Sequence, residues 1–116
     1  MDKSNNSLNV LPHSDEAELA VLGSMLSSRE AVSKSIQWLK PEYFYNESHG
    51  KIFLAMAELF EKSESIDTVS VIELLKQKNH LDDVGGTYFI TGLVDEVPTA
   101  AHAEQYSKIV MEKALL

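Results

Sequence analysis

The chain has no cysteine and only one arginine, Arg29, among its 116 residues. The absence of cysteine excludes a disulfide scaffold and a thiolate zinc site, and it fits a reducing compartment. No stretch approaches the roughly 18 consecutive apolar residues of a membrane span, and residues 1–10 lack the basic-then-apolar order of a signal peptide. We therefore expect a cytoplasmic protein that makes no use of a membrane.

Positive charge is scarce throughout the sequence. Ten lysines and arginines stand against eighteen aspartates and glutamates, which leaves a formal net charge of −8. Proteins that grip nucleic acid neutralise its phosphates mostly with lysine and arginine, so this surface should repel DNA. Residues 43–45 are aromatic, but Glu42 and Glu47 flank them where a single-strand groove needs cations, and we interpret them as closing one end of the core. A protein partner is expected instead.

Proline is also rare, and the apolar residues recur with the period of a helix. No alternating strand pattern and no internal repeat is present. We expect one all-α domain, a compact orthogonal bundle of about six short helices. The expected helices cover, in order, the stretch after Ser14, residues 30–39, the stretches after Asn46 and after Asp67, the stretch from the glycine pair to Pro98, and the stretch from Thr99 to Leu116. We expect Ser14, Asn46, Asp67 and Thr99 to be the N-caps of their helices, and Pro41 to open a single turn. The residues expected in the core include Leu22, Phe53, Met56 and Leu75.

Two adjacent glycines, Gly85 and Gly86, interrupt this helical pattern. A phosphate-binding loop would place a lysine and a hydroxyl at fixed offsets after them, whereas here Asp82 and Asp83 precede the pair and no lysine follows. The pattern favours a structural turn in which at least one glycine has a positive φ.

Candidate catalytic and metal-binding residues are not marked out by spacing. The four histidines, at positions 13, 49, 80 and 102, lack the i, i+4 pairing of a helical metal site. We interpret His49 as a solvated or capping residue at the start of its helix. No catalytic residue, cofactor-binding residue or metal ligand is expected in this chain.

Four segments together resemble the N-terminal domain of the bacterial replicative DNA helicase, the DnaB family. They are "PHSDEAELAVLGSML", "HGKIFLAMAELFEKSESID" after "FY", "LDDVGGTYFITGLVDEVPTAA" and "EQYSKIVMEKALL", in the family's order and spacing. The resemblance covers residues 11–116. Phe89 stands where the family often has tyrosine, and His102 where asparagine is usual.

The resemblance implies a division into a flexible arm, residues 1–12, and a DnaB-N-like domain, residues 13–116. In this family the domain forms one tier of a hexameric ring and docks the C-terminal domain of primase, and a helical hairpin, a linker and an ATPase domain follow it. The ATPase domain is absent from this chain, so ATP and Mg²⁺ are implied only for the full-length helicase, and DNA is contacted through the rest of that protein. The 116 residues alone are expected to be inactive.

The last helix is the segment that we expect to contact another subunit. The resemblance implies that it begins the truncated hairpin that pairs subunits, which would leave the residues near its end partly exposed. The candidate interface residues are Val110, Met111, Ala114 and Leu115. The alternative function is a free-standing all-α adaptor or regulator that never carried an ATPase.

Overall fold

The computed structural model describes residues 11–96 and 99–116, which fold into helices without a strand. The α-helices are α2 (Asp15–Ser27), α3 (Arg29–Trp38), α4 (Glu47–Glu61), α5 (Thr68–Gln77), α6 (Gly86–Gly92) and α7 (Ala103–Ala114). Short 3-10 turns, η1 (Pro41–Tyr43), η2 (Leu93–Glu96) and η3 (Ala100–His102), join some of them. The all-α prediction is confirmed. Residues 1–10 of the expected arm, Val97 and Pro98 lie outside the described residues.

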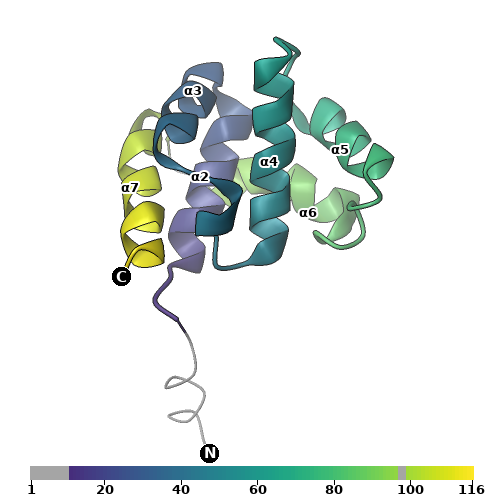
Figure 1. Cartoon of the computed structure of the whole chain (residues 1–116). Helices are drawn as coiled ribbons and strands as arrows, with labels where there is room; N and C mark the ends of the chain where they lie inside the picture. The colour runs from purple at the N-terminus through teal and green to yellow at the C-terminus, as the bar shows by residue number, and fades with distance from the viewer. Residues whose placement is uncertain (1–10, 97–98) are drawn as a thin grey trace, which may run out of the picture.

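Helix α2 is the centre of the bundle, with α7 on one side of it and α4 on the other (Figure 1). It packs against α3, α4, α7 and η2, so its side chains are buried around most of its circumference and not on one face only. Ala17 and Ala20 are buried on it, and the Ser24 hydroxyl donates to the Ala20 carbonyl at 2.7 Å. Small side chains at these positions let the neighbouring helices approach closely.

The four residues expected in the core occupy it. Leu22, Met56 and Leu75 are fully buried, and Phe53 is 2% exposed. They come from α2, α4 and α5, so one cluster joins three helices that lie apart in the sequence. Each such side chain contributes about 1.5–3 kcal/mol by leaving water, which makes this cluster the main stabilising element of the fold.

Local capping rules set most of the helix starts. The side-chain oxygens of Ser14, Asn46 and Asp67 each accept a backbone N–H from the first turn of the following helix, as the sequence predicted. Such a cap stabilises a helix by about 1 kcal/mol. Thr99 differs, because it caps η3, and α7 begins only at Ala103.

Two helices end earlier than the sequence indicated. The helix that begins at the glycine pair ends at Gly92 and tightens into η2, whose Leu93 is 1% exposed and belongs to the core. η2 packs along α2, and the tighter turn brings Leu93 inward. The last helix ends at Ala114 and does not run to Leu116, because the final turn tightens: the Leu116 N–H donates to the Lys113 carbonyl, three residues back, at 3.4 Å.

Candidate interaction surfaces

A buried carboxylate joins α2 to the start of α4. Glu18 and His49 are 1% and 5% exposed, and Glu18 Oε1 lies 2.7 Å from His49 Nδ1. The other carboxylate oxygen, Oε2, accepts the backbone N–H of Tyr45 at 2.8 Å, and Oε1 also accepts that of Asn46 at 3.4 Å. The interpretation of His49 as a solvated or capping residue is therefore wrong. Glu18 projects from the central helix α2 toward His49. The hydrogen-bonded contact between the two side chains lowers the cost of burying them.

The contact continues from His49 to the glycine turn. The His49 ring lies nearly parallel to that of Phe89 on α6, with centroids 6.2 Å apart and an interplanar angle of 5°. Phe89 lies directly against Gly85, where an added Cβ would stand 3.0 Å from the Phe89 Cβ. The position of α6 thus depends on both the buried pair and the absence of a side chain at Gly85.

The glycine pair forms a structural turn. Gly85 has φ 110° and Gly86 has φ 81°, in agreement with the expectation that at least one has positive φ. The Gly85 N–H donates to the Asp82 carbonyl at 3.2 Å, and the Gly86 N–H donates to the Leu81 carbonyl at 2.9 Å. Both amides are used within the turn, which leaves neither for an anion, as a phosphate loop would require.

Helix α6 presents one large aromatic side chain to solvent. Tyr88 is 93% exposed, although Ile90, two residues later, is fully buried. A groove of about 640 Å³ runs beside it between α2, α6 and η2. The residues that line the groove are Leu19, Gly85, Tyr88, Phe89, Thr91, Gly92, Leu93, Asp95 and Glu96. Tyrosine combines a rigid apolar ring with a polar tip, and it is enriched at protein interfaces for that reason.

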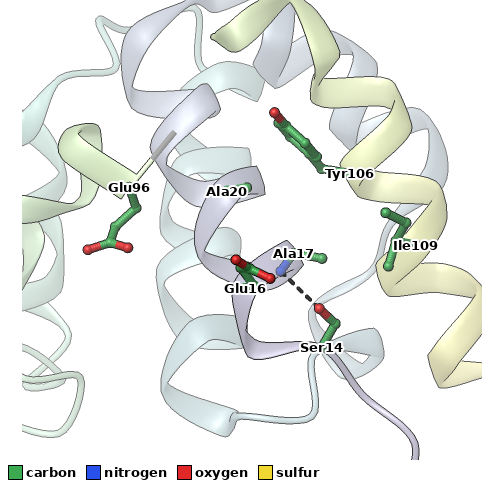
Figure 2. Close-up of a pocket in the computed structure, with 7 residues that line it drawn as sticks. All are labelled: Ser14, Glu16, Ala17, Ala20, Glu96, Tyr106 and Ile109. Atoms are coloured by element: carbon green, nitrogen blue, oxygen red, sulfur yellow. Dashed lines mark hydrogen bonds between the residues drawn. The ribbon is translucent and has the colours of Figure 1, made fainter. Parts of the chain in front are cut away.

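A second, smaller cavity of about 290 Å³ lies between the start of α2, the end of η2 and α7 (Figure 2). Ala17 and Ala20 face it from α2, and Tyr106 and Ile109 face it from α7. The remaining lining residues are Ser14, Glu16 and Glu96. The Ser14 hydroxyl is occupied by its cap, because it accepts the Ala17 N–H at 3.1 Å.

The candidate interface residues on α7 do not share one environment. Val110 is 2% exposed and belongs to the core of this domain, so its assignment to a subunit interface is corrected. α7 packs along α2 and α3, and its inward face includes Ser107 and Val110. Met111 is half-buried against the core, whereas Ala114 and Leu115 are exposed. The last two and part of Met111 remain available to a partner.

The described part of the chain contains neither a cluster of potential metal ligands nor a helix that could span a membrane. There, no three side chains of histidine, aspartate or glutamate gather as metal ligands do. None of the helices in residues 11–96 and 99–116 combines the length and the apolar character that a bilayer crossing needs.

Comparison with known proteins shows which family this chain resembles in sequence. The model of the DnaB-like helicase N-terminal domain matches residues 10–112. The chain is 41% identical over 105 residues to the replicative DNA helicase DnaB of Geobacillus stearothermophilus, covering 90% of this chain and 23% of that protein. It is 38% identical over 106 residues to the replicative DNA helicase DnaB of Rhodothermus marinus, covering 91% of this chain and 11% of that protein. The chain thus spans less than a quarter of the length of these curated relatives.

A solved structure shares the fold. The crystal structure of the N-terminal domain of DnaB helicase from Mycobacterium tuberculosis aligns with a TM-score of 0.89 and 37% sequence identity, covering 91% of this chain and 77% of that one. Family model, sequence relatives and fold agree along nearly the same residues. The chain belongs to the family of DnaB-like helicase N-terminal domains.

Proposed function

We propose that this chain is the N-terminal domain of a hexameric replicative DNA helicase that unwinds duplex DNA at the replication fork. In that protein the domain helps to assemble the ring and offers a docking surface to the C-terminal domain of primase. The observation that carries the proposal is the family match over residues 10–112. The full-length protein works in the cytoplasm, where an ATPase domain outside these residues binds ATP and Mg²⁺ and other parts of the protein contact DNA.

Exposed apolar residues near the end of α7 support the role in assembly. Ile109 is 39% exposed and Leu115 is 63% exposed, on a helix whose opposite face is already buried in the domain. Covering such side chains with a second subunit releases water from apolar surface and favours association. Met111, Ala114 and Leu115 are the contacts we propose for this interface.

The surface around Tyr88 supports the docking role. Its ring is almost fully exposed and stands at the mouth of the groove between α2 and α6. Aromatic side chains in such positions carry a disproportionate share of the binding free energy at protein interfaces. The net charge of −8 argues that the docked partner is a protein and not DNA.

A chimaera tests the role in assembly. This chain replaces the matching segment of the Geobacillus stearothermophilus relative, and sedimentation and ATP-dependent strand separation are measured. We expect a hexamer that unwinds DNA, because the chain matches the family of the segment that it replaces and presents exposed apolar residues near the end of α7. The adaptor alternative predicts a chimaera that folds but neither assembles nor unwinds, and that result would refute the assembly proposal. Leu115→Glu should shift the chimaera toward smaller species.

A binding experiment tests the docking role. The chain is titrated with the C-terminal domain of a bacterial primase in a calorimeter, and Tyr88→Ser is compared with Val69→Ser. Val69 is 76% exposed on α5, so it controls for the loss of an exposed apolar side chain elsewhere. We expect Tyr88→Ser to weaken binding by tenfold or more, on the order of a hot-spot residue. Equal affinity of the two variants would remove the surface around Tyr88 from the docking site.

A further inference from the structure

The beginning of α4 contacts the glycine turn and the start of α6 at three points. The Ser48 hydroxyl donates to the Asp83 carbonyl at 3.0 Å, and Lys51 Nζ lies 3.3 Å from Asp83 Oδ2. The His49 ring lies nearly parallel to that of Phe89, with an interplanar angle of 5°. We name Ser48, His49 and Lys51 the α4 platform. Ser48 and Asp83 are 35 positions apart, so the platform joins segments that are distant in the sequence.

His49 is the most firmly held member of the α4 platform. It is 5% exposed, and its Nδ1 lies 2.7 Å from Glu18 Oε1, so burial and a hydrogen bond together fix the orientation of its ring. The contacts of Ser48 and Lys51 with Asp83 are exposed to solvent, where water competes for the same groups and the net contribution is small. The restraint on α6 therefore comes mainly from the contact between His49 and Phe89.

Phe89 passes this restraint to the surface around Tyr88. Phe89 is half-buried and lines the groove beside Tyr88, the residue before it. In the described part of the chain, the residues that line this groove include no member of the α4 platform. A partner in the groove would meet Phe89 and Tyr88 but not His49. His49 can therefore act on docking only through the Phe89 ring.

We propose that His49 is a positioning residue for the docking surface. It fixes the Phe89 ring, and through that ring it fixes the first turn of α6, from which Tyr88 projects. A groove wall that is ordered before docking loses less conformational freedom on binding, which favours affinity. The proposal rests on the docking role proposed above and adds a residue that controls docking without contacting the partner. If His49 only stabilised the fold as a whole, its loss would have no particular effect on α6.

Hydrogen exchange of the chain tests the positioning without any partner. His49→Asn places an amide N–H near the position of Nδ1, so the hydrogen bond to Glu18 can remain while the ring is lost. Val32→Ala is the control for lost global stability, because Val32 is fully buried on α3, which packs against α2, α4 and α7. We expect the amides of Ile90 and Thr91 in α6 to exchange at least about fivefold faster in His49→Asn and to change less than about twofold in Val32→Ala. Equal acceleration in the two variants, or none in His49→Asn, would overturn the proposal.

A double-mutant cycle on docking tests whether His49 acts through Phe89. Calorimetry measures the affinity of the C-terminal domain of a bacterial primase for the unchanged chain, His49→Asn, Phe89→Leu and the double variant. We expect His49→Asn to weaken binding about fivefold in the unchanged chain and less than about 1.5-fold in the Phe89→Leu background, because the ring that it positions is then missing. The same effect in both backgrounds would mean that His49 does not act through Phe89, and the proposal would be wrong.

The two experiments distinguish a failure of this proposal from a failure of the docking role. If the unchanged chain does not bind primase but the exchange of α6 responds to His49→Asn, the docking role is wrong and the positioning of α6 by His49 is retained. If the unchanged chain binds primase and His49→Asn binds it equally well, the docking role is retained and His49 is not its positioning residue.

Discussion

Glu18 and His49 lie 31 residues apart in the sequence, yet their side chains meet at 2.7 Å inside the domain. The Glu18 carboxylate forms hydrogen bonds both with the His49 imidazole and with the backbone N–H groups of the loop that precedes α4. Removing the carboxylate would leave the buried His49 ring without its partner and two partly buried backbone N–H groups, those of Tyr45 and Asn46, without this acceptor. That cost is larger than the worth of any one of the hydrogen bonds.

Replacing Glu18 by alanine should lower the free energy of unfolding by about 3 kcal/mol, because His49 remains buried without its partner and the loop N–H groups of Tyr45 and Asn46 lose their acceptor. Urea denaturation of the purified variant measures the change. Glu112→Ala, on the exposed face of α7, is the control and should alter stability by less than about 0.5 kcal/mol. If Glu18→Ala is no more destabilising than this control, the buried pair has no structural importance.

The three glycines of the α6 region should respond differently to alanine. At Gly85 a methyl group meets both a positive φ and the Phe89 side chain 3.0 Å away, so we expect a loss of about 2 kcal/mol or more. At Gly86 only the positive φ applies, because nothing lies within 4 Å of an added Cβ, and we expect about 1 kcal/mol. Gly92 has neither feature, and Gly92→Ala should be neutral or slightly stabilising. Thermal melts rank the three, and any other order would contradict the explanation.

The isolated chain should not bind single-stranded DNA at micromolar concentration and physiological salt. Its net charge of −8 and its single arginine oppose the phosphate contacts that supply non-specific affinity. Fluorescence anisotropy of a labelled oligonucleotide measures this, with a basic single-strand-binding protein as the positive control. A salt-sensitive rise in anisotropy would show that the chain has a cationic surface that binds DNA, and would contradict the prediction.

The same chain should neither bind nor hydrolyse ATP. No G-x-x-x-x-G-K-[ST] sequence occurs in it, and the amides of Gly85 and Gly86 are engaged within their own turn. Isothermal calorimetry with ATP and Mg²⁺ at micromolar protein should give only the heat of dilution. Saturable heat would require a nucleotide site outside the turn.

Features controlled by neighbours in the sequence were predictable. The caps at Ser14, Asn46 and Asp67 and the turn opened by Pro41 depend on side chains within three residues, so composition and spacing sufficed. The all-α class followed from the period of the apolar residues, which is also a local property.

Features controlled by distant contacts were not predictable from one sequence. His49 stands beside Lys51 at the start of a helix, where exposure is usual, and only the position of Glu18 on α2 accounts for its burial. Val110 has the same apolar character as the exposed Ile109, and only the packing of α7 on α2 and α3 decides which one turns inward. Neither Glu16 nor Glu96 carries a signal that they line one cavity.

The central position of α2 determines how the domain opens. Because α2 has α3, α4, α7 and η2 around it, loss of any one neighbour leaves most of its backbone covered. Amide protons on α2 should therefore exchange with deuterium only when the whole domain unfolds, whereas those of the seven-residue α6 can exchange through local opening. The slowest-exchanging protons then report the global free energy of unfolding, and a local opening of α6 would move the surface around Tyr88 with it.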